Sequence, residues 1–135
     1  MTVQLLSPEG MLQPVPYSHV SVATGSRHVH VAGQIGRDPD TDQMADDLAG
    51  QVAQALRNTA RGLAGAGATF ADVVRLRFFV TQWSPEKMGD FMTGVELVAR
   101  ELGLPQPMPP ASLIGVDILF EADVLVELEA YAVLT

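Results

Sequence analysis

The sequence predicts an α+β fold in one domain spanning residues 1–135, with two helices covering one face of a β-sheet. The chain has 135 residues, the length of one ordinary domain, and 47% of them are apolar, enough to build a core. Two segments carry apolar residues at helical spacing, and several others alternate apolar and polar residues as strands do. The expected order is β-β-α-β-α-β-β. Because each helix has one apolar stripe to bury, both helices are expected on the same face of the sheet.

The first two strands are expected to form a β-hairpin. Residues 17–24 alternate loosely, and residues 28–35 place valines on one face. Gly25-Ser26 between them is a turn signal. Residues 36–43 are expected to be a loop because they are rich in turn-forming Gly, Asp and Pro.

The first helix is expected to begin after Asp46 or Asp47 as its N-cap and to end at Gly65 and Gly67. The residues of its buried stripe are Leu48, Val52, Ala55, Leu56, Thr59 and Leu63. The polar residues expected to face solvent are Gln51, Gln54, Arg57 and Arg61.

The second helix is expected to start at Ser84 as its N-cap, with Pro85 at the first helical position, and to end at Gly103. The residues of its buried stripe are Met88, Phe91, Met92, Val95, Val98 and Leu102. Two proline-bearing segments, residues 14–16 and 105–110, are expected to be loops.

Three further strands are expected at residues 73–81, 112–118 and 123–134. Their alternation sends two arginines and two glutamates to the sheet face that the helices do not cover. These residues are Arg75, Arg77, Glu127 and Glu129. A face that mixes such charges with apolar residues suits a subunit interface that holds a wet site.

The composition disfavours several classes of binding partner and chemical site. The net charge of −8, from 16 acidic and 8 basic residues, disfavours binding to nucleic acid, and no basic cluster is present for an anionic membrane surface. Cysteine is absent, so there is no disulfide, thiolate metal site or cysteine nucleophile. Neither a signal peptide nor an apolar stretch of about 18 residues is recognised. A cytoplasmic location is expected, with no membrane partner.

Four short segments, spread over nearly the whole chain, form an ordered set. They are Pro16-Tyr17, Val-Ala-Gly-Gln-Ile at residues 31–35, the loop and strand start at residues 65–75, and Val-Glu-Leu-Glu-Ala-Tyr-Ala at residues 126–132. Together they resemble the Rid family (YjgF-like, reactive-intermediate deaminase).

This resemblance implies a chorismate-mutase-like fold and a homotrimer whose three sheets form an inner barrel, with clefts between neighbouring subunits. The best-studied members hydrolyse reactive enamines and imines, such as 2-aminoacrylate, to a keto acid and ammonia without a cofactor. In those members an arginine in a Pro-Ala-Arg-Ser segment binds the substrate carboxylate through two parallel hydrogen bonds.

The sequence departs from the family pattern at that arginine. The corresponding segment is Pro-Pro-Ala-Ser at residues 109–112, so Ala111 or Ser112 takes the arginine's position. The asparagine often found on the family's second helix is replaced around Gly94-Val95. The sequence therefore does not predict that this protein acts on the family's carboxylate-bearing substrate.

The resemblance implies that Tyr17 and Glu127 are catalytic and that Gly33 lies in the substrate site. Ser112 and the neighbouring backbone of Leu113 are expected to bind the polar end of the substrate. A carboxylate in the middle of a strand must be paired, hydrogen-bonded or protonated if it is buried, which suits a general acid or base. The alternatives are a structural tyrosine that fills its loop and a glutamate that forms an interface ion pair.

Arg77 shares a sheet face with Glu127 and Glu129, so it either binds the anionic end of a substrate or neutralises those glutamates. His28 and His30 share one strand face and could bind a metal, but no third ligand is evident. Exposed strand histidines are the simpler interpretation, and neither a metal nor a cofactor is predicted.

Two functions remain open on the sequence alone. The first is a hydrolase of a small imine or enamine, acting in a cleft between subunits, with weak or no activity on 2-aminoacrylate. The second is a non-catalytic trimer that binds a small molecule or a protein. Ribonuclease activity is opposed by the charge of −8.

Overall fold

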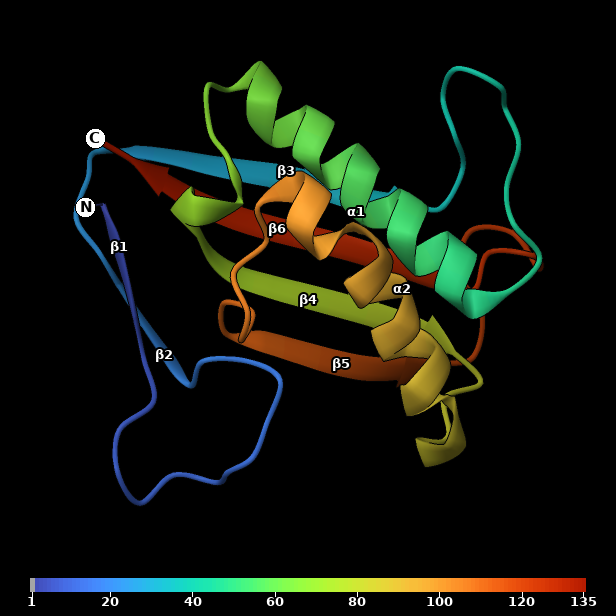
Figure 1. Cartoon of the computed structure of the whole chain (residues 1–135). Helices are drawn as coiled ribbons and strands as arrows, with labels where there is room; N and C mark the ends of the chain where they lie inside the picture. Colours follow the sequence, from blue (N-terminus) through green and yellow to red (C-terminus); the bar gives the residue numbers. More distant parts are fainter. Residues whose placement is uncertain (1) are drawn as a thin grey trace.

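The computed structural model describes residues 2–135 and has the α+β architecture expected from the sequence (Figure 1). The strands are β1 (Val3–Leu6), β2 (Val20–Ala23), β3 (Arg27–Ile35), β4 (Val73–Thr81), β5 (Ala111–Val116) and β6 (Val126–Leu134). The helices are α1 (Leu48–Gly65) and α2 (Met88–Leu102), and each is accompanied by a short 3₁₀ turn, Phe70–Asp72 after α1 and Pro85–Lys87 before α2. No helix among residues 2–135 is long and apolar enough to cross a membrane.

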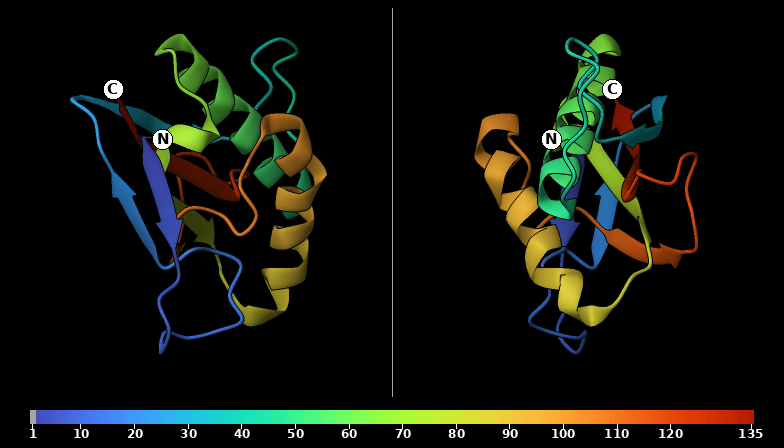
Figure 2. Two further views of the ribbon diagram at one scale, coloured as in Figure 1. Left: turned by 60° about the vertical axis from the view of Figure 1, so that its left-hand side comes forward. Right: turned by 90° about the vertical axis from the view of Figure 1, so that its right-hand side faces the viewer.

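Four strands form the main sheet, in the order β3-β6-β4-β5. The central strand β6 runs antiparallel to both β3 and β4, and β4 is parallel to β5. Both helices lie on one face of this sheet, and the other face carries no helix (Figure 2). The expected arrangement of helices and sheet is therefore confirmed.

The core lies between the helices and the covered face of the sheet. Leu76 and Phe78 of β4 and Leu128 of β6 are buried there, as the alternation predicted. The ring of Phe78 packs edge-on against Phe91 of α2, with 4.9 Å between ring centroids. A Cβ atom at Gly94 would lie 2.5 Å from the carbonyl oxygen of Ala49, so this glycine allows α2 to pack against the backbone of α1.

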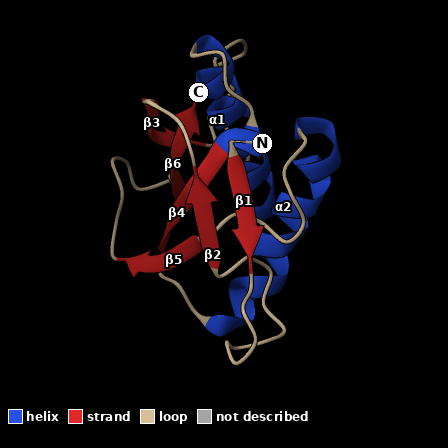
Figure 3. Cartoon of the chain, turned by 90° about the vertical axis from the view of Figure 1, so that its left-hand side faces the viewer, coloured by secondary structure: helices blue, strands red, loops and turns tan. Residues whose placement is uncertain are grey.

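The predicted hairpin of the first two strands is wrong. Strand β2 pairs with β1, a strand that the sequence analysis did not predict, and the two form a separate small sheet (Figure 3). The chain turns at Gly25-Ser26, but the strands on either side of this turn do not pair with each other. The long strand β3 pairs instead with β6, near the C-terminus.

The predicted exposure of Gln51 is also wrong, because its side chain is 1% exposed. Its amide nitrogen donates to the carbonyl oxygens of Ala45 and Asp123, at 2.8 and 2.9 Å, and its amide oxygen accepts from the N–H of Leu125 at 2.8 Å. The side chain thus satisfies three backbone groups of the loops before α1 and β6, where no water can reach them.

The predicted ends of the helices agree with the structure, except at the start of α2. Asp47 occupies the N-cap of α1, and Gly103 ends α2 in the left-handed conformation, at φ +66°. Ser84 caps the 3₁₀ turn that precedes α2, so Met88 begins the α-helix and is 42% exposed instead of buried. Strand β4 has the predicted bounds, whereas β6 begins later than predicted.

We predict that Gly94→Ala lowers the free energy of unfolding by about 2 kcal/mol, because the new methyl group meets rigid backbone of α1. Gly89→Ala on the same helix is the matched control, since a Cβ there meets nothing within 4 Å. It is expected to change the free energy by less than about 1 kcal/mol. Urea denaturation of both variants measures the difference, and equal effects would contradict the close packing of the helices at Gly94.

Candidate functional site

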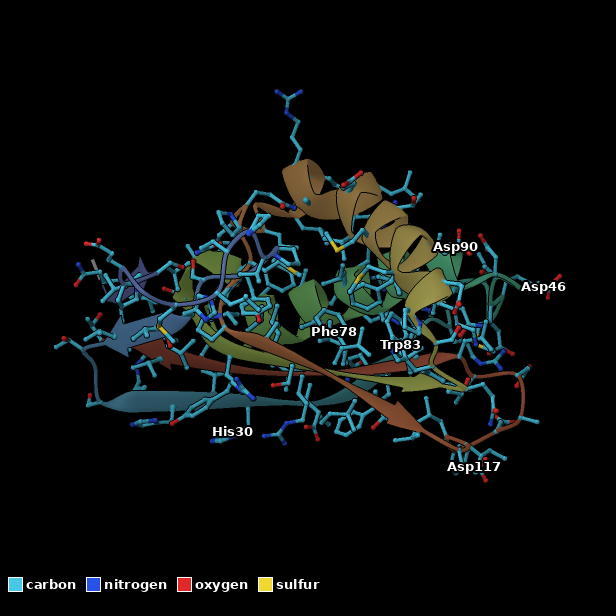
Figure 4. All side chains as sticks on the ribbon, turned by 90° about the horizontal axis from the view of Figure 1, so that it is seen from below. His30, Asp46, Phe78, Trp83, Asp90 and Asp117 are labelled. Carbon is cyan, nitrogen blue, oxygen red and sulfur yellow. The ribbon has the colours of Figure 1, made fainter. Side chains whose placement is uncertain are left out.

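The open face of the sheet contains a cavity of about 530 Å³, lined by residues from three of its four strands, β3, β6 and β4. The lining residues are His30, Val31, Ala32, Arg75, Arg77, Glu129, Ala130 and Tyr131. His30 points away from the helices, whereas Phe78 lies on the helix side of the sheet (Figure 4). Strand alternation gathers the polar residues of three strands on one surface.

Arg77 forms an ion pair with Glu129 across the β4–β6 pairing, with Nη1 3.3 Å from Oε1. Both side chains are nearly half exposed, at 46% and 43%. No ion pair joins Arg77 to Glu127 within residues 2–135. Arg77 therefore neutralises one of the two glutamates through a single contact, and its other N–H groups remain open to the cavity.

Glu127 lies on the same face, further along β6, with its carboxylate over Gly33. A Cβ atom placed on Gly33 would be 2.3 Å from Oε2 of Glu127. The irregular pairing of β3 with β6 between Val31 and Gln34 places this glycine beside Glu127. Glu127 is half buried, and its side chain forms no ion pair or hydrogen bond with another described residue, although its backbone pairs with both neighbouring strands.

Ser112 lies opposite Arg77 in the β4–β5 pairing and accepts a hydrogen bond of 2.6 Å from Nη2 of Arg75. Its neighbours Ala111 and Leu113 pack against the core. Of the two positions that could replace the arginine of the Rid pattern, Ser112 is the one on the open face. Its hydroxyl keeps one O–H to donate to a ligand.

Tyr17 lies apart from this open face, on the helix side of the edge strand β5. Its loop pairs with the second proline loop, since Ser18 N–H donates to Met108 O at 2.7 Å and Met108 N–H donates to Pro16 O at 2.9 Å. The ring borders a cavity of about 90 Å³ together with Met88, Ser112 and Leu113. Within one chain, Tyr17 is therefore near the two predicted substrate-binding residues of β5, and Glu127 does not line this cavity.

The two strand histidines contact Tyr131. The ring of His30 stacks on that of Tyr131, with 4.4 Å between centroids and 16° between planes, and Nδ1 of His28 is hydrogen-bonded to the Tyr131 hydroxyl. Across residues 2–135, no group of three or more His, Cys, Asp and Glu side chains is placed to hold a metal ion.

Two acidic groups outside the cavity have altered pKa values. A hydrogen bond and the charge of Arg61 lower the pKa of Asp40, and the same pair raises the pKa of Arg61. This contact, at 2.8 Å, ties the loop after β3 to α1. Backbone and Ser84 hydrogen bonds lower the pKa of Glu86 at the start of the 3₁₀ turn before α2.

Sequence reasoning gave no site role to Arg75 or Tyr131. The alternation of β4 already put Arg75 on the open face beside Arg77, and the alternation of β6 put Tyr131 beside Glu129. Comparing the outward positions of these two strands would therefore have brought both residues to the same face. The hydrogen bond from Arg75 to Ser112 could not be found in this way, because it depends on the register of β4 with β5.

The family described as "Endoribonuclease L-PSP" matches residues 11–134 of this chain. Structures of the Rid/YjgF family share its fold. The chain therefore belongs to the Rid/YjgF family, as the four sequence segments indicated. A comparison with the curated proteins found no match.

Among solved structures, the chain is similar to the Rid-family protein YyfB from Yersinia pestis, whose function is described as unknown, with 34% identity and a TM-score of 0.85 over 99% of this chain and 100% of that one. It is similar to Rv2704 from Mycobacterium tuberculosis, a YjgF/YER057c/UK114 member, with 32% identity and a TM-score of 0.63 over 98% and 100% of the two chains. The YjgF gene product of E. coli is 25% identical, with a TM-score of 0.70 over 97% and 94%. These matches confirm the YjgF-like fold.

We predict that Gly33→Ala lowers the free energy of unfolding by about 1 kcal/mol more when Glu127 is present than in a Glu127→Ala background, because the glutamate must leave its preferred rotamer. Chemical denaturation of the four proteins of this double-mutant cycle measures the coupling and cancels the backbone effect of alanine. Additive effects would show that the Glu127 carboxylate does not rest on Gly33.

Proposed function

We propose that this protein is a Rid-family hydrolase that acts on a small, reactive imine or enamine in a cleft between subunits of a cytoplasmic homotrimer. One observation carries the proposal: Glu127 holds a half-buried carboxylate over Gly33, with no ion-pair partner among residues 2–135. A carboxylate held in this way, free of a counter-charge, suits proton transfer to and from water.

The reaction is hydrolysis of a C=N bond. Glu127 takes a proton from water as the oxygen attacks the imine carbon, and this gives a carbinolamine. Glu127 gives that proton to the imine nitrogen, which completes the carbinolamine. It then moves the hydroxyl proton of the carbinolamine to the same nitrogen, the C–N bond breaks, and ammonia leaves as the carbonyl forms. An enamine first gains a proton on carbon and becomes the imine.

Tyr17 is the second catalytic residue of the proposal, and it positions the water or the leaving nitrogen. In one chain it lies beside α2 and β5, on the other side of the sheet from Glu127. A cleft between two subunits would bring Tyr17 of one chain toward Glu127 of its neighbour. The proposal therefore depends on the homotrimer that the family resemblance implies.

The substrate is expected to differ from 2-aminoacrylate. The resemblance puts Ala111 or Ser112 at the position where the best-studied members have arginine, and neither side chain can form the two parallel N–H···O bonds that arginine makes to a carboxylate. Ser112, the neighbouring backbone of Leu113 and Arg77 are the groups proposed to bind the polar end of the substrate. No cofactor or metal takes part in the proposed reaction.

The family's description names an endoribonuclease, but ribonuclease activity is not proposed for this chain. Its net charge of −8 opposes the approach of a phosphate backbone. A non-catalytic trimer that binds a small molecule or a protein is the alternative, because the arginine of the family pattern is missing.

We predict that the protein releases ammonia from imines generated in solution, faster for imines without a carboxylate than for 2-aminoacrylate. Glu127→Gln is expected to lower the rate by about 100- to 10,000-fold, the usual contribution of general acid–base catalysis. Glu121→Gln, at an exposed position in the loop before β6, is the matched control and should keep the wild-type rate.

The outcomes separate the two functions. A high rate on 2-aminoacrylate would contradict the argument from Ser112, and a Glu127→Gln variant with full activity would remove Glu127 from the mechanism. No release above buffer from any imine would favour the binding protein.

A further inference from the structure

The loop that carries Tyr17 spans residues 7–19, between β1 and β2, and much of it is exposed (Figure 1). Met11 and Leu12 in its middle are 43% and 74% exposed, so apolar burial does little to hold them. Near its end, the loop pairs through its backbone with Met108. A loop with so little burial needs specific contacts to hold a side chain in one place.

His19 closes this loop onto itself. Its ring nitrogen Nε2 lies 2.7 Å from the carbonyl oxygen of Leu12, seven residues earlier. Because a carbonyl oxygen can only accept, Nε2 carries a proton and donates this hydrogen bond. The backbone N–H of His19 donates to Oγ of Ser7 at 3.2 Å, so the same residue also holds the start of the loop. His19 directly precedes β2, whose pairing with β1 fixes its backbone.

The ring of His19 also contacts Tyr17. The two ring centroids are 5.3 Å apart and the ring planes are 73° apart, which is the edge-on arrangement that aromatic rings favour. Tyr17 in addition borders the cavity of about 90 Å³ that Met88 and Met92 of α2 line. One imidazole therefore both fixes the loop by a hydrogen bond and packs against the tyrosine that the loop presents to this cavity.

We propose that His19 is a positioning residue for Tyr17: by closing the loop through Leu12, it holds the phenol ring at the cavity beside α2. The inference rests on the proposed function, in which Tyr17 positions the water or the leaving nitrogen. A catalytic hydroxyl must lie within hydrogen-bond reach of its target, and a displacement of about 1 Å can lower a rate by roughly 100-fold. The contacts of His19 with Ser7, Leu12 and Tyr17 lie within one chain, so they do not require a neighbouring subunit.

The first test follows the place of Tyr17 without using activity. Nuclear Overhauser effects (NOEs) between its ring and the methionine methyl groups that line the cavity are measured in the full-length protein. Tyr131→Phe is the background of every sample, which leaves Tyr17 as the single tyrosine of the chain. His19→Ala is expected to lose these NOEs, because the loop loses the donor to Leu12. His19→Gln is expected to keep them, because its side-chain amide carries an N–H that can donate to the same carbonyl.

Ammonia release is the second measurement. His19→Ala should lower kcat about 10- to 100-fold and change KM less, because a positioned catalytic group acts mainly in the chemical step. His19→Gln should stay within about threefold of the wild-type kcat, and His19→Phe, which has a ring but no donor, should follow His19→Ala. His28→Ala is the matched control, since it removes the hydrogen bond of another histidine to the other tyrosine, Tyr131, and it should leave kcat unchanged.

The outcomes decide the proposal as follows. NOEs that persist in His19→Ala would overturn it, and so would an equal loss of NOEs in His19→Gln. Lost NOEs with an unchanged kcat in an active enzyme would remove His19 from catalytic positioning. If the wild-type protein hydrolyses no imine, the proposed function fails, while the NOEs still decide whether His19 holds Tyr17. The two proposals can therefore fail separately.

Discussion

The position of β6 in the centre of the sheet is the constraint on which the rest of the structure depends. This strand pairs along its length with β3 on one side and β4 on the other, so its backbone hydrogen bonds are used on both edges. This pairing fixes which residues of β6 point toward the helices and which point to the open face. Val126, Leu128 and Ala130 enter the core beneath the helices, while Glu127, Glu129 and Tyr131 are held on the open face. A shift of one residue would exchange these two sets, bury two carboxylates, and expose the core.

The same alternation divides the open face into two chemical regions. Near the start of β6, the Glu127 carboxylate lies over Gly33 without a counter-charge among the described residues. Further along, Arg77 meets Glu129 and Arg75 meets Ser112, beside the stacked rings of His30 and Tyr131. The first region is a carboxylate without a counter-charge, and the second is a set of polar side chains that contact one another.

The predicted catalytic pair does not meet within one chain. Tyr17 is fixed by the pairing of the two proline loops and packs beside α2 and β5, whereas Glu127 faces away from the helices. The proposed site therefore requires assembly of subunits, because a single chain carries its two catalytic residues on different surfaces. Membership of the Rid/YjgF family accounts for the fold.

The sequence by itself determined the class of fold, the bounds of β4, the glycines that end both helices, and the charged character of the open face, because these follow from local periodicity and capping. The tertiary structure alone decided that β2 pairs with β1, that Gln51 is buried between two loops, and that Arg75 reaches Ser112. Each of these depends on which distant segments lie side by side and in which register, and no local pattern of residues specifies that choice.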